Sequence, residues 1–293
     1  MEIKMKDFIV PFSKDLDLKK YETKAPKEFH DKEKNKKMLS DIVKEIDYYQ
    51  NILYAEGKQS LLIVFQGIDA AGKDSSIRAI MTGVNPQGVE VTSFKTPTSQ
   101  EYKYNYLWRH QNKIPQKGKI GIFNRSHYEN VLISRVHPQF ILNENIPSVN
   151  SLNDINEKFF NQRYDEINKF EKFLENNGTQ VLKFFLNISK DEQKKRFIKR
   201  IENKEKNWKF SSSDLKEREF WNQYQKAFTL ALQNTSTDYS PWFIIPCDYK
   251  SYGQLIMGYL IKETLKKMHP KFPNIDNQEK KELDISYKNL LKE

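Results

Sequence analysis

The chain has 293 residues and a formal net charge of +10, with 38% hydrophobic and 30% charged residues. This length is sufficient for one large α/β domain, and a single cysteine, Cys247, excludes an internal disulfide framework. Because no apolar run approaches ~20 residues and no secretory signal is recognisable, we expect a soluble, cytoplasmic protein without a membrane partner. The positive net charge indicates either a polyanionic partner or only a lysine-rich, solvated surface.

Hydrophobic periodicity predicts alternating helices and strands along most of the chain. A lysine-rich N-terminal arm covers residues 1–34, and a charged C-terminal tail covers residues 270–293. Between them we expect five strands, at 61–66, 89–94, 119–124, 180–186 and 241–246, and helices that include 35–54, 75–82, 99–109, 155–174 and 251–268. This alternation predicts an α/β three-layer sandwich with a five-stranded, mostly parallel sheet, in a domain of residues 35–269.

Two further helices are expected before the last strand, joined by a basic loop. Ser189 and Glu192 have the spacing of a capping box, and Asp214 and Glu217 repeat it before a helix with an apolar face over 220–231. Such a pair would form a lid over about residues 190–220, which closes over phosphates and excludes water. The charge pattern alone fits a solvated basic hairpin equally well.

The strongest functional signal lies at residues 61–76. An apolar strand leads directly into Gly-Ile-Asp-Ala-Ala-Gly-Lys at 67–73, which is the G-x-x-x-x-G-K pattern of a phosphate-binding loop. Gly67 and Gly72 allow the backbone to curl so that its N–H groups point at an anion, and Lys73 adds a positive charge. The pattern, with a strand before it and a helix after it, predicts a fold of the P-loop kinase type.

The expected metal ligands depart from the common pattern at two positions. Asp74 stands where a Ser or Thr usually binds magnesium, so this role should pass to Ser75, to the next serine, or to the loop carboxylate Asp69. The third strand ends in Asn124 instead of an aspartate. Asparagine can bind a metal through water but brings no charge, which places more of the task on Asp69 and Glu129.

Several cationic side chains are expected beside the phosphates. Lys95 follows the second strand, and Arg125 follows the third, where its planar guanidinium would match phosphate oxygens unless it only forms a salt bridge at the start of a helix. Arg196 and Arg200 lie four residues apart on one face of a predicted helix. No histidine–carboxylate pair stands out as a general base. This favours an acceptor that is itself a phosphate, already anionic near neutral pH.

Taken together, these residues resemble the polyphosphate kinase 2 family. The motifs occur in the family's order over about residues 34–267: GIDAAGKD at 67–74, FKTPT at 94–98, LWR at 107–109, FNRSHYE at 123–129, RVHP at 135–138, WKFS at 208–211 and SPW at 240–242. The resemblance implies a thymidylate-kinase-like fold with a helical lid. It also implies reversible, Mg²⁺-dependent phosphate transfer between inorganic polyphosphate and nucleotides.

The resemblance further implies a role for individual residues. The implied catalytic residues are Asp69, Lys73, Arg125 and Glu129, and the implied metal ligands are Asp69 and, through water, Asn124. The implied contacts to phosphate or polyphosphate are Gly67, Ala70, Ala71, Gly72, Lys73, Asp74, Ser75, Lys95, Arg109, Arg125, Arg196, Arg200 and Lys209.

Two positions bear on the nucleotide acceptor. Many members of the family have Asp at the position of Asn124 and Asn at the position of Glu129. Members with Asn-Arg-Ser-His-Tyr-Glu look like the subgroup that accepts nucleoside monophosphates as well as diphosphates. We therefore expect ADP and GDP as substrates, with AMP and GMP as further acceptors. We also expect a homo-oligomer, either a dimer or a tetramer.

Two other functions are compatible with the same loop. An ATP-dependent nucleoside monophosphate kinase would use ATP as the donor, and polyphosphate would be inert. A nucleic-acid-associated P-loop ATPase would explain the basic charge, and would show ATP hydrolysis that is stimulated by DNA or RNA. No basic segment interleaved with aromatic residues matches a nucleic-acid module, so we expect no nucleic-acid partner.

Overall fold

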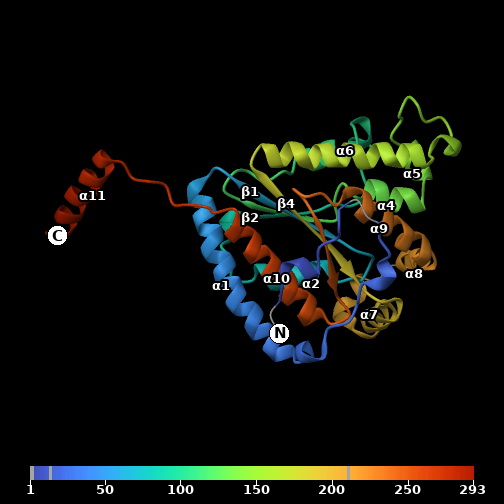
Figure 1. The fold of residues 1–293 in the computed structure, drawn as a ribbon, viewed down its shortest axis with the longest axis horizontal. Helices are drawn as coiled ribbons and strands as arrows, with labels where there is room; N and C mark the ends of the chain where they lie inside the picture. The colour runs from blue at the N-terminus through green and yellow to red at the C-terminus, as the bar shows by residue number, and fades with distance from the viewer. Residues whose placement is uncertain (1–2, 13–14, 210–211) are drawn as a thin grey trace.

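The computed structural model describes residues 3–12, 15–209 and 212–293. Five strands form one sheet at the centre of the molecule (Figure 1), in the spatial order β2-β3-β1-β4-β5. They are β1 (Ser60–Gln66), β2 (Val89–Ser93), β3 (Ile120–Asn124), β4 (Thr179–Asn187) and β5 (Trp242–Pro246). All neighbouring strands are parallel, which confirms the predicted sheet. Because β1 pairs with both β3 and β4, the loop that leaves β1 starts between the carboxyl ends of two strands.

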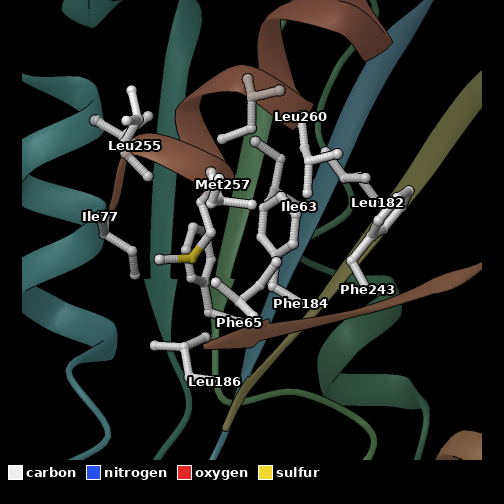
Figure 2. Close-up of a cluster of buried hydrophobic side chains, with 14 of the residues drawn as sticks. Ile63, Phe65, Ile77, Leu182, Phe184, Leu186, Phe243, Leu255, Met257 and Leu260 are labelled. Atoms are coloured by element: carbon white, nitrogen blue, oxygen red, sulfur yellow. The ribbon is translucent and has the colours of Figure 1, made fainter. Parts of the chain in front are cut away.

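Helices pack on both faces of the sheet and complete the three layers. One face is covered by α1 (Lys32–Glu56), α2 (Lys73–Met81) and α10 (Lys250–Lys267), and the other by α4 (Glu129–Val136), α6 (Glu157–Asn176) and α9 (Trp221–Thr235). Successive residues of a strand point to opposite faces, so the apolar run along β1 supplies both cores. Figure 2 shows part of the first core, which contains Ile63, Phe65, Ile77, Leu182, Phe184, Leu186, Phe243, Leu255, Met257 and Leu260.

The long helix α1 has the ends that its sequence encodes. The Asp31 side chain accepts hydrogen bonds from the backbone N–H groups of Glu33 and Lys34 and so caps the first turn. Gly57 ends the helix in the left-handed conformation, with φ of 62°. The predicted helix over 35–54 is therefore confirmed and extends a little further at both ends.

Residues 99–109 do not form the single helix that was predicted. The structure has a 3₁₀ turn at Glu101–Lys103 and the short helix α3 (Trp108–Gln111). Thr98 and Glu101 exchange side-chain-to-backbone hydrogen bonds and open only one turn. The side chain of Asn105 then accepts from the N–H of Leu107 and starts a new turn. Local side-chain bonds of this kind compete with a continuous helix.

The helices before β5 also differ from the prediction. They are α7 (Lys190–Glu202), then a 3₁₀ segment at Lys204–Lys209, α8 (Ser212–Glu219) and α9. Asp214 lies within α8 and binds Arg200 through its carboxylate, so it does not cap a helix as expected. The helical conformation is interrupted at Phe220, between the end of α8 and the start of α9. A further short helix, α5 (Gln139–Leu142), follows α4.

The two ends of the chain behave differently. Near the N-terminus, Ile9 forms an antiparallel bridge with Phe243, so the arm runs along the outer edge of β5. In the C-terminal tail, an unpredicted helix, α11 (Asn277–Leu290), stands away from the body (Figure 1) and buries none of its residues. Asp276 and Glu279 form a capping box at its start, and this was the sequence signal for it. Among the described residues, no helix has the length and apolarity to cross a bilayer.

Candidate active site

The loop at residues 67–72 connects β1 to α2 in a tight curl. Gly67 and Gly72 have φ of 157° and 108°, and Ala70 lies at 63°, in the left-handed region. A Cβ at Gly67 would lie 3.1 Å from both the Leu186 carbonyl oxygen and the Ala71 side chain, so a larger residue there would displace the loop. The helix α2 begins directly at Lys73, which is earlier than predicted. The partial positive charge of the helix N-terminus therefore lies at the end of the curl.

Lys73 lies within this curl, and only 9% of the residue is exposed. Its ammonium group donates to the carbonyl oxygens of Gly67 and Ile68, so the side chain spans the loop. Burial lowers the pKa of Lys73, and the Asp69 carboxylate opposes this shift. The arrangement holds a cation where the strand ends, as the sequence predicts.

Asp69 and Arg125 join the loop to the end of β3. Their side chains form an ion pair, with 3.0 Å between Arg125 Nη2 and Asp69 Oδ1. Arg125 has φ of 62°, and its N–H donates to the carbonyl oxygen of Phe65 in β1. This unusual conformation turns the chain at once from β3 into α4. Glu129, the first residue of α4, completes the group. Burial raises the pKa of Glu129, and the nearby Arg125 and Lys73 oppose this shift.

Asn124 does not stand alone at the end of β3. Its amide nitrogen donates to Asp74 Oδ1 at 2.9 Å and contacts Ser93 Oγ at 3.3 Å. The amide oxygen thus becomes the group that is left to accept a hydrogen bond. The Ser75 hydroxyl donates to the carbonyl oxygen of Gly72. Asp74 and Ser75 therefore both help to hold the local backbone and side chains in place around the loop.

Arg196 lies beneath the loop and is 5% exposed. Its guanidinium donates to the carbonyl oxygens of Ala70, Ala71 and Cys247, and its Nε pairs with Glu192 at 2.8 Å. These bonds engage both terminal nitrogens and Nε, so in this structure Arg196 fixes the shape of the loop. Glu192 consequently completes only half of the predicted capping box, because the Ser189 hydroxyl accepts from its backbone N–H while its carboxylate turns to the arginine.

Arg200, one turn further along α7, is placed differently. Its guanidinium is partly exposed and lies 3.4 Å from the Asp214 carboxylate of α8. The two arginines that looked equivalent in the sequence are therefore separated, one under the loop and the other between the helices α7 and α8. The side chain of Lys209 lies outside the described part of the structure, as do residues 210–211 of the WKFS motif.

A cavity of about 470 Å³ opens beside the loop. Its wall includes Gly67, Asp69, Lys95, Arg109, Arg125 and Glu129, so six of the predicted site residues border one space. Arg109 Nε lies 3.2 Å from the carboxylate of Glu101, and its guanidinium lies over the ring of Phe94.

The helices α8 and α9 supply residues of this wall that sequence reasoning missed: Asp214, Glu217, Arg218, Trp221 and Tyr224. Tyr224 belongs to the apolar face that was predicted from periodicity, and its hydroxyl donates to Glu217 at 2.6 Å. His137, at the end of α4, also contacts Glu217, at 2.9 Å. A continuous apolar face predicts burial, but it does not reveal that one end of the face borders a cavity.

The fold and the site define an α/β protein with a glycine-bounded loop, a buried lysine and a facing Asp–Arg pair at the carboxyl ends of the central strands, an arrangement suited to phosphoryl transfer. A model of the family "Polyphosphate kinase 2" matches residues 29–273. The chain belongs to the polyphosphate kinase 2 family, which confirms the resemblance seen in its motifs.

Individual relatives agree with this assignment. The chain is 41% identical over 292 residues to an ADP-polyphosphate phosphotransferase of Rhodopseudomonas palustris, covering 100% of both chains. It is also 41% identical to an AMP/ADP-polyphosphate phosphotransferase of Meiothermus ruber, over 83% of this chain and 85% of the relative. The crystal structure of polyphosphate kinase 2 from Arthrobacter aurescens superposes with a TM-score of 0.82 at 32% identity, covering 95% of this chain and 99% of that one.

Proposed function

We propose that this chain transfers phosphate reversibly between inorganic polyphosphate and nucleoside phosphates, converting ADP and GDP to ATP and GTP. The observation that carries the proposal is the ion pair between Asp69 and Arg125, set beside the curled loop on the wall of one cavity. Positive groups and backbone N–H groups would neutralise the transferring phosphate, and most of the catalysis would come from their placement. The helices α7 and α8 would act as the lid over about residues 190–220.

The donor distinguishes this function from that of an ATP-dependent nucleoside monophosphate kinase. We expect the protein with Mg²⁺, polyphosphate and ADP, in the absence of ATP, to produce ATP. The measurement is chromatographic detection of the triphosphate over time. If polyphosphate is inert while ATP phosphorylates AMP, the chain is a nucleotide-dependent kinase and the proposal is wrong.

The residues around the loop fit a divalent cation that is also held by water and substrate. Arg125 takes Oδ1 of Asp69, and within the described residues Oδ2 makes no hydrogen bond. The amide nitrogen of Asn124 is engaged by Asp74 and Ser93, which leaves the amide oxygen to accept a hydrogen bond from a metal-bound water. Among the described residues of the whole chain, no group of three or more His, Cys, Asp or Glu side chains is arranged to hold a metal ion. This suits Mg²⁺, which commonly keeps several waters and bridges substrate phosphates through one or two carboxylates. The ion would neutralise developing charge on the transferring phosphate.

AMP and GMP are proposed as further acceptors because Glu129 follows the Asn-Arg-Ser-His-Tyr motif. Replacing Glu129 with asparagine should lower activity with AMP more than activity with ADP, because the carboxylate borders the cavity beside Arg125. The measurement is kcat/KM for each acceptor at saturating polyphosphate. Equal losses with the two acceptors would show that Glu129 does not discriminate between them.

The proposal also includes the assembly, location and domain limits of the protein. We propose a cytoplasmic homo-oligomer, a dimer or tetramer, with no nucleic-acid or membrane partner. The catalytic unit is residues 35–269, flanked by the arm at 1–34 and the tail at 270–293. Light scattering coupled to size-exclusion chromatography would give the number of subunits, and a monomer would contradict the oligomer.

A further inference from the structure

An ionic network lies in the second core, on the side of the sheet covered by α4, α6 and α9. Lys183 of β4 and Glu171 of α6 are both 0% exposed, and 2.5 Å separates Lys183 Nζ from Glu171 Oε2. Lys183 stands between two apolar residues of the same face of β4, Val181 and Phe185. A buried charge is costly, so a lysine at this position requires complete compensation.

The network supplies that compensation. The ammonium of Lys183 also donates to the Tyr128 hydroxyl at 3.0 Å and to the Thr235 carbonyl oxygen at 2.7 Å, so it has three acceptors for three protons. Glu171 Oε1 accepts from the Tyr128 hydroxyl at 2.7 Å and contacts His127 Nε2 at 3.3 Å. Burial raises the pKa of Glu171, but the interactions with Lys183 and His127 lower it overall.

His127 and Tyr128 connect this network to the site, because they lie between Arg125 and Glu129. The backbone at Arg125 is left-handed, a conformation that is unfavourable for a residue with a side chain. Such a conformation persists where its surroundings fix it. The Ser126 hydroxyl accepts hydrogen bonds from the Gln66 side chain and from the Tyr128 N–H, and these two bonds hold the turn. The contacts of His127 and Tyr128 with Glu171 tie the same turn to α6.

We propose that Glu171, compensated by Lys183, positions Arg125 and Glu129 by anchoring His127 and Tyr128. None of Lys183, Glu171, His127 and Tyr128 lines the cavity. The network reaches the site through the segment at 125–129 and through His110, a residue of the cavity wall whose ring packs against His127. The inference rests on the proposed function for its kinetic test. The anchoring itself is open to a test that needs no activity.

Tyr128→Phe is the sharpest variant, because it removes one hydroxyl and leaves the ring, which packs edge-on against Trp242. Tyr164→Phe makes the same change in the same core, on α6, away from the Glu171 carboxylate. We expect Tyr128→Phe to lower kcat at least about tenfold with little change in KM for polyphosphate, because misplacing a catalytic group by a fraction of an ångström is costly. We expect Tyr164→Phe to leave kcat unchanged and to lower the melting temperature little or not at all, because its buried hydroxyl has no hydrogen-bond partner among the described residues.

A double-mutant cycle tests whether Tyr128 acts through Arg125. In an Arg125→Lys background, Tyr128→Phe should add a much smaller loss of kcat than it causes in the wild type. Full additivity of the two losses would overturn the proposal. If the wild-type protein is active, equal kcat values for the single variants Tyr128→Phe and Tyr164→Phe would also overturn the proposal. Absence of polyphosphate-dependent transfer in the wild type would instead overturn the proposed function.

Amide hydrogen exchange tests the anchoring without any turnover. Tyr128→Phe should raise exchange in peptides covering residues 124–130, and Tyr164→Phe should not. Unchanged protection of this segment in Tyr128→Phe would contradict the proposal. If Tyr128→Phe does not fold, two double mutants at Glu171 and Lys183 take its place in the test. Glu171→Gln/Lys183→Met keeps an acceptor for Tyr128 and should retain protection, whereas Glu171→Leu/Lys183→Met removes the acceptor and should lose it.

Discussion

Replacement of Lys73 by alanine or methionine should lower kcat by at least two orders of magnitude, which corresponds to about 3 kcal/mol of transition-state stabilisation. The ammonium lies in the curl of the loop beside Asp69, where negative charge on the transferring phosphate would be stabilised. Asp69→Ala should have an effect of the same size, since it removes both the proposed carboxylate ligand of the metal and the partner of Arg125. The measurement is initial-rate kinetics with polyphosphate and ADP, together with thermal melting.

The melting curves decide how this loss is interpreted. Lys73→Met retains the aliphatic stem of the side chain and should stay folded. Lys119→Met makes the same change in an exposed ion pair with Glu90, at the start of β3, and should retain full activity. Near-normal turnover in Lys73→Met would show that the loop lysine does not contact the reacting phosphate.

Arg196 and Arg200 should separate cleanly into a structural residue and a substrate-binding residue. Arg196→Met should lower the free energy of unfolding by at least about 3 kcal/mol, because it leaves several buried carbonyl oxygens without donors. Arg200→Met removes one long, partly exposed ion pair and leaves no buried carbonyl oxygen without its donor, so it should cost about 1 kcal/mol. Urea unfolding of both variants measures this difference.

Activity gives the complementary result. Arg200→Met should raise KM for polyphosphate with little change in stability, since its guanidinium lies between α7 and α8, the helices proposed as the lid. Arg196→Met should lower kcat even when the protein is fully folded, because the loop loses the donors that fix its carbonyl groups. Equal stability of the two variants would contradict the structural role of Arg196.

The same pair shows which part of the site could be predicted from the sequence. The spacing of four residues places both arginines on α7, and this was correct. What separates them is the approach of the Cys247 carbonyl oxygen and of the loop carbonyls, which come from distant parts of the chain. Helical periodicity carries no information about such contacts. The glycine-bounded loop, in contrast, was predictable, because its chemistry is local.

The strands were predictable for a similar reason: four are short apolar runs with clear limits, and β2 carries the β-branched residues Val89, Val91 and Thr92. The segment at 99–109 was not, because Thr98, Glu101 and Asn105 divert the backbone with short-range hydrogen bonds. The Glu171–Lys183 pair was also missed. Lys183 occurs within a strand that reads as apolar, and its partner lies on a helix that precedes it in the sequence. Only the assembled fold shows that the two charges meet.

The two edge strands of the sheet, β2 and β5, differ in how far their outer backbone groups are already paired. Phe8 and Val10 of the N-terminal arm form backbone hydrogen bonds with β5, whereas β2 pairs with β3 alone among the described strands. Unpaired N–H and C=O groups of an edge strand can bond to a strand of another chain. The arm therefore occupies backbone groups of β5 that would otherwise be available to a second chain.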